Sequence, residues 1–145
     1  KKGCVAPGVP ELLEWSHAHP EVHNALLTGN IRRGARIKLG HYNLNSYFEF
    51  GAFGDDSPDR NLLGPIALDR ARVRLNKDFH LRHTWVIGDT PRDIACGRAL
   101  GCKALAVATG RYPLEKLRAC GPDAALADLS RRDEVIAVLE APFGA

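Results

Sequence analysis

The sequence contains no methionine among its 145 residues, although translation starts with that residue. Its first residue is Lys1, which we therefore expect not to be the natural start of the protein. No apolar run reaches the roughly 18 residues that a membrane-spanning helix requires. The amino-terminal region also lacks the apolar stretch of a signal peptide. These absences predict a cytoplasmic protein without a membrane partner.

Paired cysteines and a strong charge of one sign are also missing. No two cysteines form a C-x-x-C pair, so we expect free thiols rather than a zinc site or a disulfide framework; the cysteines are Cys4, Cys96, Cys102 and Cys120. The net charge is only +3, and no run of Lys and Arg exceeds two residues. A polyanionic partner such as nucleic acid is therefore not expected.

What the sequence does contain is an alternation of short apolar strands with amphipathic helices. The strands are expected at residues 22–27, 47–53, 84–88, 103–108 and 123–127. The helices are expected at residues 9–19, 31–40, 61–74, 91–100, 114–119 and 131–139. Short strands alternating with longer helices indicate βαβ units. We therefore predict an α/β fold, a Rossmann-like three-layer α/β/α domain with a parallel sheet.

Ligands of such sheets bind beyond the carboxyl ends of the strands, so the loops there are the first place to look for a site. The run Thr28-Gly29-Asn30 follows one strand and precedes a helix, where free backbone N–H groups can bind an anion. The alternative is structural, with Thr28 or Asn30 capping the helix and Gly29 permitting a tight turn.

The run Gly88-Asp89-Thr90-Pro91-Arg92-Asp93 follows another strand and carries two carboxylates. Carboxylate oxygens suit Mg²⁺, which prefers one or two of them together with water and phosphate. The alternative is a capping box in which Thr90 is the N-cap and Asp93 the third helical residue. That alternative leaves Asp89 unexplained, so Asp89 is the stronger candidate for a functional carboxylate.

Lys38 lies ten residues after Thr28 in the helix that follows it. Ten helical residues span about 15 Å, so Lys38 can approach Thr28 only if the helix starts late. The alternative is a solvated basic helix face shared with Arg32, Arg33 and Arg36.

Several motifs together resemble the haloacid dehalogenase superfamily, and most closely its phosphoglycolate-phosphatase-like hydrolases. They are ALLTGN at residues 25–30, Lys38-Leu39, VIGDTPRDIACGRALG at residues 86–101 and KALAVATGRY at residues 103–112. The resemblance implies that Thr28 binds the transferring phosphoryl group and that a lysine steadies it. It also implies that Asp89 holds Mg²⁺ with help from Asp93, and that the substrate is a small phosphorylated metabolite.

The chain departs from this family in two places. Family members often carry the lysine in a K-P-x-P stretch, but residues 55–60 contain no Lys, so Lys38 becomes the candidate and Arg60 a weaker substitute. The D-x-D-x-T motif, which supplies the nucleophile and the general acid/base, is absent, and the earliest Asp is Asp55.

The family strand that bears this motif lies between the strands that end here at Leu27 and Ile87. We therefore expect residues 1–145 to be the carboxyl-side portion of the core, with the first strand and a helical cap encoded upstream. Direct pairing of those two strands would contradict this expectation. As given, the chain is expected to be inactive or nearly so.

For the whole protein, the resemblance implies Mg²⁺-dependent hydrolysis of a small phosphate monoester through an aspartyl-phosphate. Thr28, Gly29 and Asn30 would bind phosphoryl oxygens, Lys38 would neutralise charge, and Asp89 and Asp93 would form the metal site. One alternative is a 2-haloacid dehalogenase, which uses the nucleophile without Mg²⁺. Another is a non-catalytic domain that binds phosphate or a partner. The oligomeric state and the exact substrate are left open.

Overall fold

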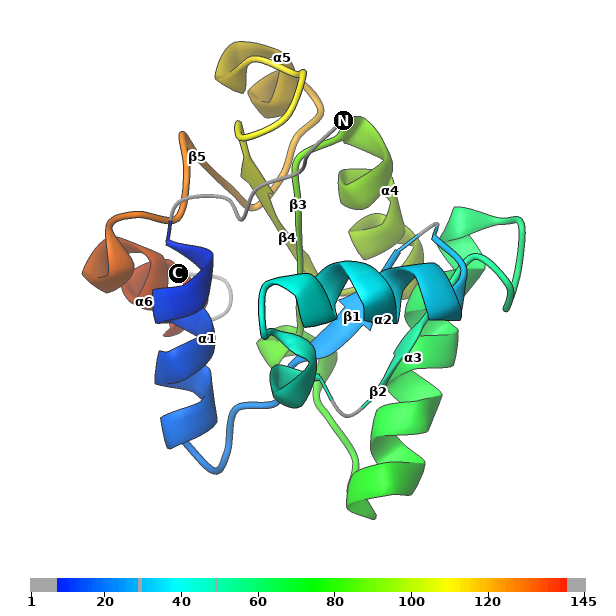
Figure 1. The fold of residues 1–145 in the computed structure, drawn as a ribbon. Helices are drawn as coiled ribbons and strands as arrows, with labels where there is room; N and C mark the ends of the chain where they lie inside the picture. The colour runs from blue at the N-terminus through cyan, green and yellow to red at the C-terminus, as the bar shows by residue number, and fades with distance from the viewer. Residues whose placement is uncertain (1–7, 29, 49, 141–145) are drawn as a thin grey trace. The chain divides into compact units, whose positions relative to one another are not determined.

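The structure is a computed structural model that describes residues 8–28, 30–48 and 50–140 (Figure 1). The chain packs as two compact units. The two-stranded unit comprises residues 13–79, and the three-stranded unit comprises residues up to 12 together with those from 80 onward. Within the described residues, no helix is both long enough and apolar enough to cross a membrane.

The three-stranded unit alternates strands and helices along the chain. It begins with the first turn of α1 (Val9–Ala18) and continues through a 3₁₀ turn at Leu81–His83. The remaining elements are β3 (Trp85–Gly88), α4 (Pro91–Leu100), β4 (Lys103–Val107), α5 (Leu114–Ala119), β5 (Ala124–Leu126) and α6 (Arg132–Glu140). The strands are parallel in the order β3-β4-β5, with Trp85 opposite Lys103 and Leu105 opposite Ala124.

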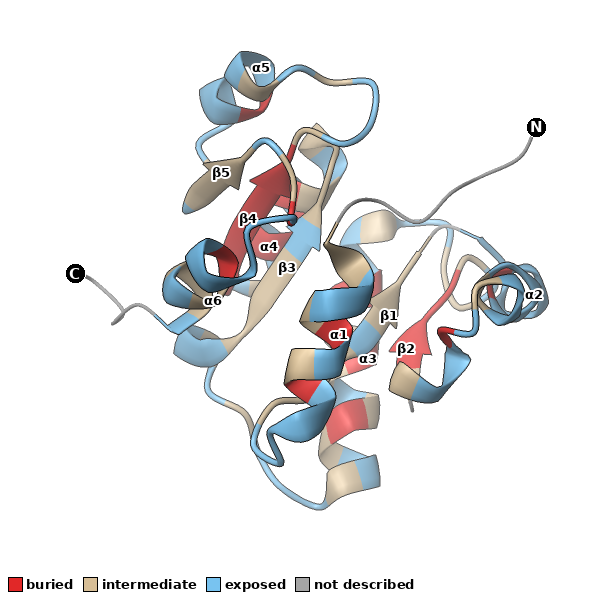
Figure 2. Ribbon diagram, turned by 60° about the vertical axis from the view of Figure 1, so that its left-hand side comes forward, coloured by how far each residue is buried: buried red, intermediate tan, exposed pale blue. Residues whose placement is uncertain are grey.

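The central strand β4 is buried along its whole length (Figure 2). Because side chains alternate between the two faces of a strand, Ala104 and Ala106 pack with residues of α4 and α5 on one face. Leu105 and Val107 pack on the other face with Val135 of α6 and with residues of the first turn of α1. A sheet covered on both faces by helices is the predicted three-layer arrangement.

The two-stranded unit contains β1 (Ala25–Leu27), α2 (Arg32–His41), a 3₁₀ turn (Asn45–Tyr47), β2 (Phe50–Ala52) and α3 (Arg60–Leu75). β1 and β2 are parallel, with Leu26 opposite Gly51. α3 begins at the N-cap Asp59, whose carboxylate accepts the N–H of Asn61. Ala52, Leu63 and Ala67 form the buried core between α3 and the strands.

The alternating α/β pattern predicted from the sequence is confirmed, and the boundaries of α4 and α5 are reproduced exactly as expected. The first two strands are shorter than predicted, because Asn45–Tyr47 forms a 3₁₀ turn and β2 has only three residues to pair with β1. Among the described strands, β1 is hydrogen-bonded only to β2, and β3 only to β4. The described strands β1 and β3 are therefore not paired directly with each other. Such pairing would have contradicted the expectation of an additional strand.

Candidate active site

Asp89 lies directly after β3, at the carboxyl end of that parallel strand. A Cβ atom built on Gly110 would overlap the Asp89 carboxyl group, so the backbone at Gly110 lies against this side chain. Gly110 belongs to the loop that follows β4, and the carboxyl ends of parallel neighbours meet at one edge of the sheet. The loop after β4 therefore forms one wall around the Asp89 carboxylate. Sequence reasoning missed Gly110, although a Gly after a buried strand is a turn signal.

Thr90 and Asp93 form a capping box at the start of α4. The Thr90 N–H donates to Asp93 Oδ2 at 3.1 Å, and the Asp93 N–H donates to Thr90 Oγ1 at 3.3 Å. The Thr90 hydroxyl also donates to Asp93 Oδ2 at 2.9 Å. This confirms the structural interpretation of Thr90, Pro91 and Asp93 as a capping box. Asp89 stands outside the capping box.

Thr28 lies beyond β1, in the loop that leads to α2. Its N–H donates to the Ala52 carbonyl at 3.1 Å, which extends the β1–β2 ladder by one bond. Its Oγ1 accepts the Asn30 N–H at 3.1 Å, and the Asn30 carbonyl accepts the Gly54 N–H at 2.7 Å. The loops after β1 and β2 are therefore joined at the strand ends. Gly29, the third predicted phosphate-binding residue, lies outside the described residues.

The N-terminus of α2 is capped across the two loops. The helix begins at Arg32 rather than beside Thr28, and its preceding residue Ile31 supplies no side-chain cap. Instead the Arg32 N–H donates to Asp55 Oδ1 at 3.0 Å. A carboxylate is favourable at a helix N-terminus because the free N–H groups there carry partial positive charge. Asp55 thus takes up one of the donors that the sequence analysis had expected to be free for an anion.

The loop after β2 is held by Arg70 of α3. Arg70 donates to both oxygens of Asp56, at 2.8 Å and 2.6 Å, and to the Gly51 carbonyl at 2.7 Å. The Phe53 N–H donates to Asp56 Oδ2 at 2.8 Å. The hydrogen bond from Arg70, then that from Phe53, and the nearby charges of Arg70 and Arg32 hold the pKa of Asp56 well below its usual range. Asp56 is therefore charged at neutral pH and anchors the loop.

The two candidates for the family lysine lie on different helices of the two-stranded unit. Lys38 is exposed in the last turn of α2, six residues after the helix begins and about 9 Å along its axis. Arg60 is the half-buried first residue of α3 and follows the loop after β2.

The predicted site residues fall into two groups. Thr28, Asn30 and Lys38 belong to the two-stranded unit, whereas Asp89 and Asp93 belong to the three-stranded unit. Each group lies at or after the carboxyl ends of parallel strands, apart from Lys38. The assignment of both groups to one site is taken from the family resemblance.

The carboxylate of Asp89 is the group that fits the implied Mg²⁺ ion. Among the residues that the structure describes, no group of three or more His, Cys, Asp or Glu side chains is placed to hold a metal. Mg²⁺ in phosphoryl-transfer sites usually takes one or two protein carboxylates and fills its other positions with water and phosphate. Asp89, walled by the Gly110 loop, fits that requirement. Asp93 Oδ2 is held by Thr90, and the role of Asp93 as a ligand stays a prediction.

A Rossmann-like α/β fold with an acidic loop at a strand end is the architecture that the haloacid dehalogenase resemblance implies. Residues 63–131 match the model of the HAD-hydrolase-like family. No curated protein sequence matches the chain. Over this segment the family match bears out the resemblance to HAD-like hydrolases.

Solved structures share this fold over most of the chain. A candidate β-phosphoglucomutase from Thermotoga maritima has 24% identity, with 90% of this chain and 58% of that chain covered at a TM-score of 0.73. A predicted phosphoglycolate phosphatase from Haemophilus somnus has 17% identity, with 92% and 57% covered at a TM-score of 0.74. A haloacid dehalogenase-like hydrolase from Streptococcus pneumoniae has 18% identity, with 90% and 58% covered at a TM-score of 0.67. At these identities the likeness establishes the fold.

The chain is shorter than the proteins that it resembles. It spans 58% of the length of the Thermotoga maritima protein and 57% of the Haemophilus somnus protein. The described core therefore corresponds to a part of those chains.

Proposed function

We propose that the whole protein is a Mg²⁺-dependent phosphatase that hydrolyses a small phosphate monoester through an aspartyl-phosphate intermediate. The observation that carries the proposal is Asp89 at the end of β3, walled by Gly110 and left outside the Thr90–Asp93 capping box. The match to the HAD-hydrolase-like model, which includes this segment, supports it.

In the proposed reaction, a carboxylate oxygen of a nucleophilic Asp attacks phosphorus, and the bond to the ester oxygen breaks. The leaving alkoxide takes a proton from the general acid/base Asp of the same motif. Water then gives a proton back to that Asp and attacks the acyl phosphate, which regenerates the nucleophilic carboxylate and releases phosphate. Residues 1–145 contain no D-x-D-x-T motif, so the proposal takes this nucleophile from outside them. The residues of this chain contribute binding and charge stabilisation.

Thr28 is suited to hold a phosphoryl oxygen. Its Oγ1 accepts the Asn30 N–H through a lone pair, and a hydroxyl that accepts one hydrogen bond still has its O–H to donate. The Thr28 hydroxyl would thus donate to phosphate, with Asn30 fixing its position.

A metal ligand and a cation complete the proposed machinery. Asp89 would hold Mg²⁺, which when bound supplies positive charge that stabilises the transferring phosphoryl group. Asp93 would keep the loop in place through the capping box. Lys38 or Arg60 would neutralise charge on the phosphate.

The test is release of p-nitrophenol from p-nitrophenyl phosphate by the whole protein, with and without EDTA. Asp89→Asn is expected to lower kcat by roughly 100-fold or more, because it removes the charge that holds the metal. Asp133→Asn is the matched control, since Asp133 lies on α6 with a side chain that is 97% exposed. Activity that resists both EDTA and Asp89→Asn would contradict the proposal.

The remaining outcomes separate the alternatives. Turnover of a 2-haloacid without added metal would favour a dehalogenase, and binding of phosphate without turnover would favour a non-catalytic domain. Comparison of Lys38→Met with Arg60→Met identifies the phosphate-side cation, because only loss of that residue should lower kcat.

A further inference from the structure

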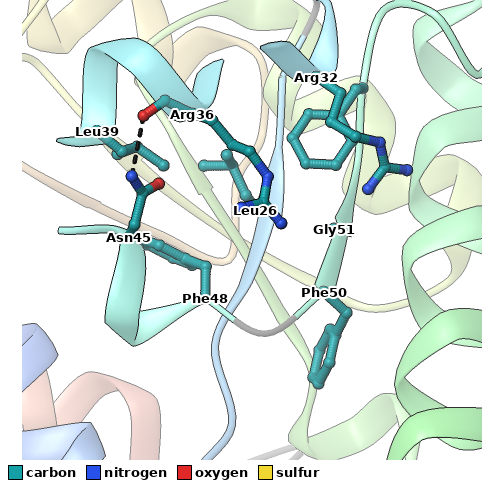
Figure 3. A pocket seen from close by; sticks show the side chains of 9 residues that line it. Leu26, Arg32, Arg36, Leu39, Asn45, Phe48, Phe50 and Gly51 are labelled. Atoms are coloured by element: carbon teal, nitrogen blue, oxygen red, sulfur yellow. Dashed lines mark hydrogen bonds between the residues drawn. The ribbon is translucent and has the colours of Figure 1, made fainter. Parts of the chain in front are cut away.

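A pocket lies in the two-stranded unit between α2 and the β1–β2 ladder (Figure 3). We call it the Arg36 pocket. The residues that give it its chemistry are Arg32, Arg36, Asn45, Phe48 and Phe53. It faces the middle of the ladder at Leu26 and Gly51, rather than the strand ends that carry Thr28.

The side chains that line the Arg36 pocket include two cations and no acid. Residues 31–53 carry four Lys and Arg residues against one acid, Glu49, so this segment alone has a net charge equal to the +3 of the entire chain. Glu49 lies outside the described residues. The helix α2 itself is basic, because it carries Arg32, Arg33, Arg36 and Lys38 and no acid.

The two arginines of the Arg36 pocket differ in their surroundings. The Arg32 guanidinium lies over the Phe53 ring, 4.5 Å from the ring centroid, in a cation–π contact. Arg32 also begins α2 beside Asp55, and its charge contributes to the lowered pKa of Asp56. Its positive charge is therefore already balanced in part by the acidic loop after β2.

Arg36 is one turn further along α2 and extends across the pocket toward Leu26 (Figure 3). Among the described residues, no carboxylate forms an ion pair with it. The wall beside it is fixed, because the Asn45 side chain donates to the Arg36 carbonyl at 2.9 Å and so ties the 3₁₀ turn to α2. Phe48 follows this turn and lines the same wall.

We propose that the Arg36 pocket, between α2 and the middle of the β1–β2 ladder, binds a small aromatic carboxylate. The Arg36 guanidinium pairs with the carboxylate, for which its two parallel N–H groups are matched. The aromatic ring of the ligand packs against the Phe48 side chain. One unbalanced guanidinium matches one negative charge, which favours a carboxylate over a phosphate dianion.

The proposal is tested by titration of the protein with sodium benzoate, followed by isothermal calorimetry and by NMR. Benzoate is expected to bind the wild type, and Arg36→Met should weaken binding at least about tenfold, since it removes the charged hydrogen bonds. Arg33→Met is the matched control on the same helix, because Arg33 is exposed and does not line the pocket. Its affinity for benzoate should be unchanged.

Further variants keep the test independent of folding and of catalysis. Arg36→Lys retains the positive charge but loses the two parallel N–H donors of the guanidinium, so its affinity for benzoate should be intermediate. The NMR spectrum of the free protein should be unchanged in this variant. Thr28→Val should not affect benzoate binding, so failure of the phosphatase proposal would leave this result intact. Equal binding of acetate and benzoate, unchanged binding by Arg36→Met, or no binding of benzoate by the wild type would each overturn the proposal.

Discussion

At the scale of single residues, the strand-end loops are organised by contacts that place one group against another. The carboxyl group of Asp89 lies against Gly110, and the side chain of Asp93 lies against Gly88, where a Cβ atom would overlap it. Glycine allows a close approach of backbone to side chain that no other residue permits. The positions of both carboxylates therefore depend on glycines that have no chemistry of their own.

Gly110→Ala should weaken the response to Mg²⁺, because the added methyl group would push the Asp89 carboxylate from its position. Changes beside a metal ligand typically lower metal affinity 10- to 100-fold, so a rise of about that size in the Mg²⁺ concentration for half-maximal activity is expected. Gly34→Ala is the matched control, since its Cβ would meet only Ile31 Cγ1 at an ordinary 3.7 Å. An unchanged Mg²⁺ requirement in Gly110→Ala would contradict the assignment of Asp89.

At the scale of elements, the loop after β2 connects three parts of the two-stranded unit. Gly54 is bonded to the loop after β1, Asp55 caps α2, and Asp56 is held by Arg70 of α3. A bidentate Arg–carboxylate pair is among the stronger side-chain hydrogen bonds. Because the Asp56 side chain is only 17% exposed, solvent screens this pair less than a surface ion pair. The Arg70–Asp56 pair thus ties the loop after β2 to α3.

Asp56→Asn should lower the melting temperature at neutral pH, and the difference from the wild type should shrink in acid. The pKa of Asp56 is lowered in the folded protein, so its contribution to stability is full above the unfolded pKa of about 4 and is lost as the pH falls through the folded value. Thermal unfolding from pH 7 to pH 2 measures this difference. Asp69→Asn, whose side chain is 74% exposed, is the control and should have little effect. A difference that grows as the pH falls would contradict the assignment.

At the scale of the whole molecule, the two units differ in how much core each sheet carries. The three-stranded unit has buried clusters on both faces of β4, including Leu105, Leu117 and Val135. The two-stranded unit has one cluster between its ladder and α3. Two paired strands are only marginally stable without further packing, so the two units should differ in local stability.

Amide hydrogen exchange followed by mass spectrometry should show this difference. Peptides that contain β1 and β2 are expected to exchange at least about tenfold faster than the peptide that contains β4, because local opening exposes amides where few apolar contacts hold them. Exchange rates are compared after correction for the intrinsic rate of each peptide. Equal protection of the two sheets would show that the described chain opens as one cooperative unit.

The three cysteines that the structure describes all lie in the three-stranded unit. Cys96 and Cys102 are buried in the three-stranded unit and Cys120 is exposed, and none of these three forms a disulfide. Burial raises the pKa of the Cys102 thiol to about 11, so its reactive thiolate form is scarce at neutral pH. Cys4, the fourth cysteine for which a thiol is predicted, lies outside the described residues.

The sequence by itself determined the features that depend on neighbours along the chain. The alternation of strands and helices follows from local hydrophobic periodicity, and the Thr90–Asp93 capping box follows from residues three positions apart. The candidates Thr28 and Asp89 were found because each directly follows a predicted strand.

Only the tertiary structure decided which distant groups meet. Asp55 reaches the α2 N-terminus across 23 residues, Gly110 lies against Asp89 across 21, and Asp56 is held by Arg70 across 14. Arg36 likewise faces a pocket only because α2, the 3₁₀ turn and β2 fold around it. Such contacts depend on strand register and loop path, which the local periodicity of a sequence does not specify.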